Sequence, residues 1–401
     1  MTEPTPGQAP AASRATLVPL MLAAFTGTVG IMAFVAVAGP LAHVLSLEPW
    51  HLGVAMAIAG VAWMVMARVW GVRSDRAGRR PVLLLGLAGF CLSYLALALF
   101  IEAARHFALP AAAAFAGIAI GRAAMGTFYA AVPVVAGAVV ADTVRPEGRA
   151  KSMAAIGAAS SAGLMVGPGF AGLLAGWSLQ LPLYVTAALP LFALALLWVA
   201  LPAETPGDAR PRPAPRLSDP RLRPAMVFGF LAAFAVAIAQ VVVGFFAIDR
   251  LGLDPAAAAA AAGTALAVVG LALVTTQTLM QKLDWSPLRL VATGAALAAA
   301  GFAATAAATT PFMLWAAYGF AAAGMGMVYP AVPALAANSV DPGEQGAAAG
   351  SVAMAQGLGI VAGPLAGTAL YALFPAAPYL ASALALGGGA LAALRLALRR
   401  A

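Results

Sequence analysis

Charged residues divide this chain into long uncharged segments. Of its 401 residues, 9% are charged and 63% are hydrophobic. A soluble protein of this length needs far more charge to cover its surface. A helix needs about 20 apolar residues to cross a bilayer, so most of the segments can span one, and the pattern predicts an all-α membrane protein. The segments are 15–47, 49–67, 81–101, 106–141 (interrupted by Arg122), 152–203, 224–248, 255–281, 290–340 and 345–394.

Three of these segments are about twice the length of one span. Each contains a turn signal near its middle, where Gly, Pro and small polar residues gather. Splitting them there predicts twelve transmembrane helices, six on each side of a polar middle segment. The signals are Gly176-Trp177-Ser178 with Pro182, Thr309-Thr310-Pro311, and Pro375-Ala376-Ala377-Pro378.

The distribution of Lys and Arg predicts that both termini are cytoplasmic. In this orientation all 22 basic residues except Arg105, Arg122 and Arg250 lie in inner loops and tails. Membrane proteins carry such an excess of basic residues on the cytoplasmic side. The net charge of +8 follows from the same bias. Since the basic residues are scattered and lack interleaved aromatic residues, nucleic-acid binding is not expected.

A segment rich in Pro and Arg, residues 204–223, separates the two sets of six spans. It contains five prolines and five arginines, a composition that indicates an extended cytoplasmic linker. We therefore expect five parts along the chain. They are a cytoplasmic tail over 1–15, an N-terminal six-helix bundle over 16–203, the linker over 204–223, a C-terminal six-helix bundle over 224–396 and a cytoplasmic tail over 397–401.

The two sets of spans repeat one another in sequence. Gly126, Tyr129 and Pro133 have equivalents 200 residues later, and Gly167-Pro168 has one 196 residues later. Repeated halves with a substrate site between them are a common plan of secondary transporters. The repeat predicts two pseudo-symmetric bundles that expose one site alternately to each side. The equivalent residues are Gly326, Tyr329, Pro333 and Gly363-Pro364.

Arg122 is the one charged residue predicted well inside a span. A charge at the centre of a helix costs roughly 2.5–3.5 kcal/mol on insertion scales, so it usually marks a functional site. Met125, Gly126 and Tyr129 follow at helical spacing, and we expect all four residues to share one face beside a cavity. The repeat places Ala322 at the equivalent position, so the charge is unique to the first half. The alternative is a structural arginine that bonds carbonyl groups of the first helix.

Two further motifs complete the pattern. The predicted loop between the second and third spans reads Gly71-Val72-Arg73-Ser74-Asp75-Arg76-Ala77-Gly78-Arg79-Arg80, and the fifth span carries Gly163, Gly167, Pro168 and Gly172. With Arg122 and Gly126, these residues resemble the major facilitator superfamily, in particular its twelve-helix drug:proton antiporters, which include tetracycline exporters. The resemblance extends from the first span to the last.

This resemblance implies roles for the motif residues. A conformational latch would comprise Gly71, Asp75, Arg76, Gly78, Arg79 and Arg80 with Asp142. It would also face a helix N-terminus in the other half and hold the outward-facing state. Arg122 would serve proton coupling, and the antiporter motif of the fifth helix would seal the interface between the halves. The alternatives are that the arginines only anchor the inner face and that the glycines only pack helices.

Few polar residues remain to bind a substrate. The candidates are Gln240, Tyr329, Gln356 and Phe34, although the polar ones can equally bond a neighbouring helix. Many relatives carry an acidic residue in the first helix, whereas residues 15–47 contain none. Proton coupling is therefore implied by the resemblance and not by an identified carrier.

Together these features predict a monomeric exporter in a bacterial inner membrane. It would expel small amphipathic molecules, such as a drug or a self-made metabolite like a siderophore, in exchange for protons. No nucleotide-binding Gly-rich loop with Lys, cofactor motif or metal-ligand set is found, so we expect neither an enzyme nor a metalloprotein. The alternatives are a proton-coupled importer of a nutrient or organic anion, and a membrane sensor or enzyme that retains the transporter fold.

Overall fold

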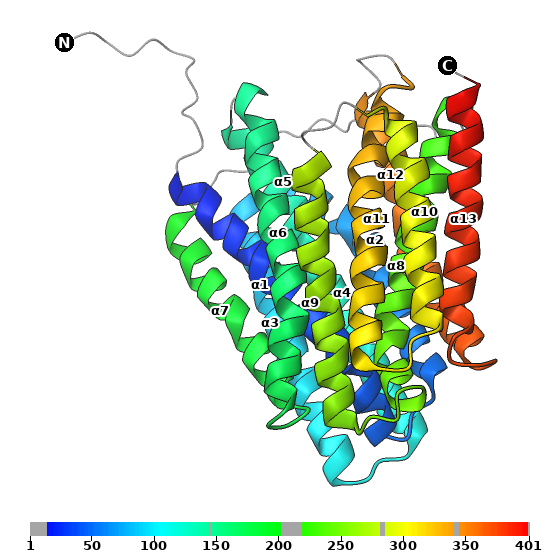
Figure 1. The fold of residues 1–401 in the computed structure, drawn as a ribbon. Coiled ribbons are helices and arrows are strands. Elements are labelled where there is room, and N and C mark those ends of the chain that lie inside the picture. Colours follow the sequence, from blue (N-terminus) through cyan, green and yellow to red (C-terminus); the bar gives the residue numbers. More distant parts are fainter. Residues whose placement is uncertain (1–13, 145, 202–218, 281–284, 341–344, 400–401) are drawn as a thin grey trace.

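A computed structural model shows how the chain folds (Figure 1). It describes residues 14–144, 146–201, 219–280, 285–340 and 345–399, and all regular structure in these ranges is helical. Twelve of its segments are long and apolar enough to cross a membrane. The twelve predicted spans are thereby confirmed.

The first six spans are built from seven helices, because one span is divided in two. Their bounds are α1 (Arg14–Val44), α2 (Pro49–Ala77), α3 (Arg79–His106), α4 (Ala111–Tyr129), α5 (Ala131–Thr143), α6 (Pro146–Ala175) and α7 (Leu181–Ala200).

The last six spans follow a short 3₁₀ helix, η1 (Pro220–Leu222). Their bounds are α8 (Arg223–Asp249), α9 (Pro255–Met280), α10 (Pro287–Ala306), α11 (Pro311–Ala337), α12 (Gln345–Tyr371) and α13 (Ala377–Leu398). The predicted bundle limits at residues 16, 224 and 396 fall inside α1, α8 and α13, so these three helices are slightly longer than expected.

The division of the fourth span into α4 and α5 was not predicted. A proline ring clashes with the carbonyl group four residues before it and offers no N–H to bond it. Pro133 lies four residues after Tyr129, where α4 ends. The equivalent Pro333 lies within the continuous helix α11, so the two halves differ at this point.

Helix packing repeats between the halves. In the first half α1 packs on α6, and α2 and α3 pack on α4; in the second half α8 packs on α12, and α9 and α10 pack on α11. Across the interface, the contact of α6 with α9 is matched by the contact of α12 with α2. The repeat seen in the sequence therefore corresponds to two pseudo-symmetric bundles.

Both ends of the described chain lie at one end of the molecule, which we call the terminal end (upper in Figure 1). At the opposite end the two halves are in close backbone contact. A Cβ atom added to Gly39 of α1 would lie 2.8 Å from the backbone nitrogen of Phe245 in α8. A Cβ atom on Gly53 of α2 would lie 2.7 Å from the carbonyl oxygen of Pro364 in α12. Only glycine allows this approach, and we call this end, where the halves touch, the closed end.

The motif at residues 71–80 is almost entirely helical, which corrects the predicted loop. Helix α2 extends to Ala77, α3 begins at Arg79, and only Gly78 lies between them. The chain reverses direction at this residue, whose φ is 92° and ψ 155°. This region of backbone space is accessible essentially only to glycine. The helical geometry of the motif thus depends on the absence of a side chain at Gly78.

Replacing Gly78 with Ala should destabilise the reversal by about 1–3 kcal/mol, because the added Cβ disfavours this backbone conformation. We expect a lower midpoint of thermal unfolding for the purified protein in detergent. Gly357→Ala is the matched control, since a Cβ at this helical position meets nothing within 4 Å. A Gly78→Ala protein as stable as the control would contradict this account of the turn.

Candidate functional site

Two adjoining cavities lie at the interface between the halves. The first, the N-half cavity, has a volume of about 340 Å³ and is lined by residues of α1, α2, α4, α5, α8 and α12. The second, the C-half cavity, has a volume of about 320 Å³ and is lined by residues of α6, α8, α9, α10 and α11. Gln240 of α8 lines both. Together they offer the space of a drug-sized ligand site.

The helical spacing after Arg122 places its neighbours along the N-half cavity. Arg122, Met125, Gly126 and Tyr129 all line it. Gly126 also allows α4 to approach α2 closely, since a Cβ atom there would lie 2.3 Å from the carbonyl oxygen of Ala59. Among the described lining residues of both cavities, Arg122 is the one that carries a charge.

The Arg122 side chain is 7% exposed and lies over an aromatic ring. Its guanidinium carbon is 4.7 Å from the centroid of the Phe34 ring. Such a cation–π contact contributes up to about 2 kcal/mol when desolvated. The Nε atom is buried, and it has no hydrogen-bond partner in the part of the chain that the structure describes. The Arg122 guanidinium therefore contacts α1 through the Phe34 ring, and no hydrogen bond to a carbonyl group of α1 is found among the described residues.

Phe34 therefore has a different place from the one expected. It is 1% exposed and lies beneath Arg122, and it is absent from the residues lining either cavity. Gln356 does not line these cavities either. Its side chain faces α8, where a Cβ atom added to Gly229 would lie 3.3 Å from the Cγ of Gln356. Any contact of these two residues with a substrate stays a prediction.

The two equivalent tyrosines have different surroundings. The Tyr129 hydroxyl lies 3.1 Å from Thr28 Oγ1 and 3.4 Å from the carbonyl oxygen of Ala24, both on α1. Tyr329 lines the C-half cavity, and no hydrogen bond from its hydroxyl is found within the described residues. For the Gln240 side chain, the one hydrogen-bond partner found among the described residues is the distant Met32 sulfur, 4.0 Å from Nε2. Tyr329 and Gln240 are thus the polar groups with the most freedom to bind a ligand.

Sequence reasoning missed three polar residues of the C-half cavity, one of which, Tyr318 of α11, has its hydroxyl bonded to the carbonyl oxygen of Ala239 and to Tyr379. Ser161 of α6 and Gln277 of α9 both line it. Gln277 is an amide in an apolar span, the same signal that identified Gln240. Ser161 gives no such signal, because serine is common in tightly packed transmembrane helices.

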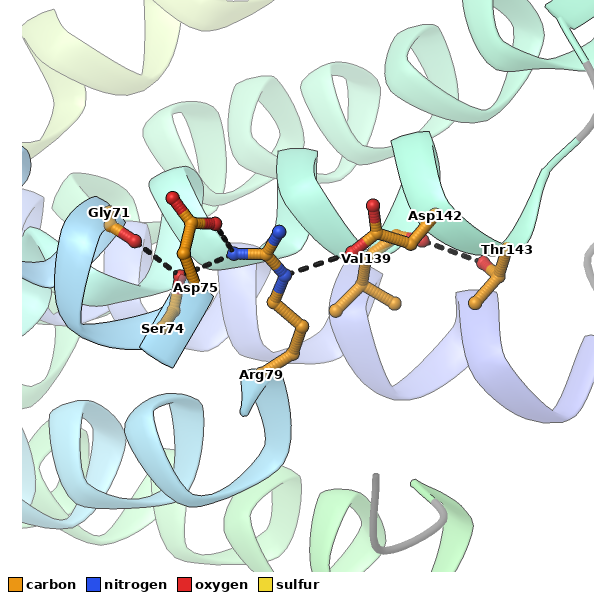
Figure 2. Close-up of polar contacts among 7 residues, drawn as sticks. All are labelled: Gly71, Ser74, Asp75, Arg79, Val139, Asp142 and Thr143. Carbon is orange, nitrogen blue, oxygen red and sulfur yellow. Dashed lines mark hydrogen bonds and ion pairs between the residues drawn. The ribbon is translucent and has the colours of Figure 1, made fainter. Parts of the chain in front are cut away.

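A charge cluster joins three helices of the first half at the terminal end (Figure 2). Arg79 of α3 donates hydrogen bonds to Asp142 Oδ2 of α5 at 2.9 Å, to Ser74 Oγ of α2 at 2.7 Å, and to Asp75. Ser74 in turn donates to the carbonyl oxygen of Gly71 at 2.8 Å. One oxygen of each carboxylate thus accepts from Arg79, and the cluster ties α2, α3 and α5 together.

The other two arginines of the predicted latch lie outside this cluster. Arg80 donates to the carbonyl oxygen of Trp198 in α7 at 2.6 Å and lies over the Trp198 ring at 5.4 Å. Arg76 is exposed. The expected contact of the cluster with a helix N-terminus of the other half stays a prediction, since the hydrogen bonds found for the cluster among the described residues all lie within the first half.

The glycines of α6 face two different neighbours. Cβ atoms on Gly163 and Gly167 would lie 2.6 and 2.7 Å from carbonyl oxygens of α1, within the same half. Further along, a Cβ on Gly172 would lie 3.3 Å from the Cα of Gly263 in α9, across the interface. A Cβ on Gly263 would lie 2.5 Å from the carbonyl oxygen of Pro168. The first part of the motif packs one half, and the second part forms the contact between halves.

Comparison with known proteins agrees with this architecture. The family model described as Major Facilitator Superfamily matches residues 20–364 and 257–401. The chain belongs to the major facilitator superfamily. It is a multi-pass membrane transporter of this superfamily, related to tetracycline exporters.

Several relatives share most of their length with the chain. The class G tetracycline resistance protein of Vibrio anguillarum is 32% identical, and the class C protein of Escherichia coli is 30% identical, each over 80% of both chains. Among solved structures, a bacterial homologue of the human lysosomal transporter Spinster, in an inward-facing unoccupied conformation, has a TM-score of 0.71 at 16% identity. It covers 94% of this chain and 92% of its own. The human organic anion transporter MFSD10 has a TM-score of 0.65 at 20% identity, covering 96% and 100%. These two structures establish the fold alone.

Replacing Gly172 with Leu should force α6 and α9 apart at the closed end, because the added side chain would meet the backbone of α9. We expect loss of transport and faster thiol labelling of cysteines introduced at this closed end, in a protein that still inserts into the membrane. Gly157→Leu on the same helix is the control, since a Cβ there meets nothing within 4 Å. Equal labelling rates for the two variants would rule out the glycine contact as the seal.

Proposed function

We propose that this protein is a secondary exporter of small amphipathic molecules in a bacterial inner membrane. The observation that carries the proposal is the central cavity between two pseudo-symmetric halves, closed at one end by glycine contacts. The tetracycline resistance proteins among its relatives support a drug as substrate. A self-made metabolite of similar size and polarity is an equally suitable cargo.

The terminal end faces the cytoplasm in this proposal, because almost all of the basic residues lie in loops and tails on that side. The closed end then faces outward, and the arrangement corresponds to an inward-facing state. Export requires that the cavity loads in this state and empties after the halves have rotated about it.

The two halves, residues 16–203 and 224–396, act as the moving bodies. Within the first, Gly163 and Gly167 hold α6 on α1 during the movement. The contacts of Gly172 with α9 and of Gly53 with α12 form in the inward-facing state and separate in the outward-facing one. Since they are van der Waals contacts between backbones, they can separate without exposing an unpaired charge.

The charge cluster around Arg79 biases the balance between the two states. Asp75 and Asp142 hold the ends of α2, α3 and α5 together, and this rigid unit can dock on the start of α12 when the terminal end closes. A carboxylate at a helix N-terminus gains about 0.3–1 kcal/mol, enough to shift an equilibrium between two nearly equal states. The latch therefore favours the outward-facing state.

Proton antiport drives the cycle, and Arg122 couples it to substrate movement. A buried arginine without a carboxylate partner is sensitive to any charge that enters the cavity. The protein acts as a monomer, because each chain contains both halves and a complete cavity.

Import of an organic anion is the second candidate function. It is supported by the unpaired positive charge of Arg122 in the cavity. The cavity can bind the same compound in an exporter and in an importer, so binding does not distinguish the two candidates. The direction of transport does.

The decisive experiment uses everted membrane vesicles that contain the protein. A proton gradient is imposed so that the interior of the vesicles is acidic. We expect tetracycline or another member of a panel of amphipathic compounds to accumulate, and we expect an uncoupler to abolish this accumulation. Uptake only into right-side-out vesicles would establish the importer and refute export. Absence of transport with retained catalytic or signalling activity would indicate a sensor or enzyme instead.

In the same vesicles, Arg122→Ala should abolish exchange, because the one charge among the described residues that line the cavity is removed. The variant should still insert, since losing a buried charge eases insertion by roughly 2.5–3.5 kcal/mol. Arg105→Ala is the control, being an exposed arginine near the end of α3. Unchanged exchange by Arg122→Ala would remove Arg122 from the coupling mechanism.

A further inference from the structure

The electrostatic environment of Arg122 is incomplete. The ion pairs found in the described part of the chain join Arg79 to Asp75 and Asp142, and Arg221 to Asp219, all away from the cavity. Arg122 is 7% exposed and has a buried Nε atom without a hydrogen-bond partner. A buried charge is stable when it is paired and its protons are bonded. The Phe34 ring supplies only part of this stabilisation, and it covers only one face of the guanidinium.

An anionic ligand would complete this environment. Arg122 lines the N-half cavity, so a group placed in the cavity can reach it. Guanidinium presents parallel N–H groups in a planar fork that matches a pair of oxygen atoms on a carboxylate or sulfonate. Because the site has a low dielectric constant, this pairing is stronger than the same contact in water.

The remainder of the two cavities suits an apolar body. Around Arg122 the N-half cavity is lined by Ile31, Met56 and Trp63 among others, and the C-half cavity by Leu266 and Phe302 among others. Methionine and aromatic side chains adapt to ligands of different shape.

The charge also sets the orientation of a ligand. Ala322, which is equivalent to Arg122 in the repeat, lines the C-half cavity. The N-half cavity therefore offers a cation, whereas the described lining of the C-half cavity is uncharged and mostly apolar, and the Gln240 amide lies where the two cavities meet. A molecule with one anionic end has a single favourable direction in this site.

We propose that the cavity selects amphipathic organic monoanions, with the anionic oxygens on Arg122 in the N-half cavity and the apolar body extending past Gln240 into the C-half cavity. The proposed substrate class rests on the proposed function in one respect, because both take the cavity as the substrate site. Strongly cationic drugs are excluded as preferred ligands, because the described lining residues offer them no carboxylate and one repelling charge.

Equilibrium binding to purified full-length protein in lipid nanodiscs tests the proposal without any gradient. The probes are anilinonaphthalene sulfonate and N-phenylnaphthylamine, which share one aromatic skeleton and differ by the sulfonate. Arg122→Gln should weaken sulfonate binding roughly 10- to 100-fold, as expected for a lost hydrogen-bonded charge, and change binding of the neutral probe less than about threefold. Arg105→Gln, which removes an exposed arginine, should leave both affinities unchanged.

A second measurement uses the unmodified protein, so the test does not depend on folding of the variant. Naphthaleneacetic acid should displace the bound sulfonate probe at concentrations roughly 10-fold or more below those needed for naphthaleneacetamide. Equal displacement by acid and amide, or sulfonate binding within threefold of normal in folded Arg122→Gln protein, would overturn the proposal. Failure of vesicle transport together with Arg122-dependent binding would instead refute the exporter and leave the anion site standing.

Discussion

Close approach of helix backbones is the interaction on which this structure depends. Lipid is as apolar as the side chains that face it, so burial from water cannot drive one transmembrane helix onto another, and small residues at the contacts replace that driving force. Gly163 and Gly167 bring α6 onto α1, and Gly359 and Gly363 bring α12 onto α8 in the equivalent way. The same kind of contact, at Gly39 and Gly172, joins the halves to each other. Packing within a half and sealing between halves are thus variants of one interaction.

Two arginines of the first half, Arg79 and Arg122, have opposite surroundings. In the Arg79 cluster at the terminal end, the guanidinium donates to both carboxylates and to Ser74. Arg122 has the reverse situation, with a buried and partly unbonded guanidinium in an apolar cavity. A satisfied cluster is suited to holding helices together, whereas an unsatisfied one is suited to binding what enters. In our proposals, the Arg79 cluster therefore controls conformation and Arg122 binds the substrate.

Much of this architecture could be predicted from the sequence. The twelve spans followed from charge and turn signals, and the pseudo-symmetry followed from recurring residues such as Tyr129 and Tyr329. The spacing after Arg122 was sufficient to place its neighbours on one face, since helix geometry is fixed by the backbone.

Other features needed three-dimensional structure. A sequence does not show which helix a glycine faces. It could therefore not be predicted that the first glycines of the α6 motif contact α1 and the last contacts α9. Phe34 was expected in the cavity and lies beneath Arg122, because an aromatic side chain in an apolar span looks the same whichever neighbour it touches. The loop expected at residues 71–80 was wrong, because a reversal at a single glycine leaves the flanking residues helical.

The most direct test of the central claim measures both ends of the molecule at once. Spin labels replace Arg105 and Arg250 at the closed end in one protein, and Arg76 and Arg289 at the terminal end in another, with Cys91 changed to Ala; all four arginines are exposed. Distances are measured in nanodiscs, with and without a transported compound at acidic pH. Alternating access predicts that the closed-end distance lengthens as the terminal-end distance shortens. Distances that stay fixed at both ends during demonstrated transport, or that lengthen together, would contradict it.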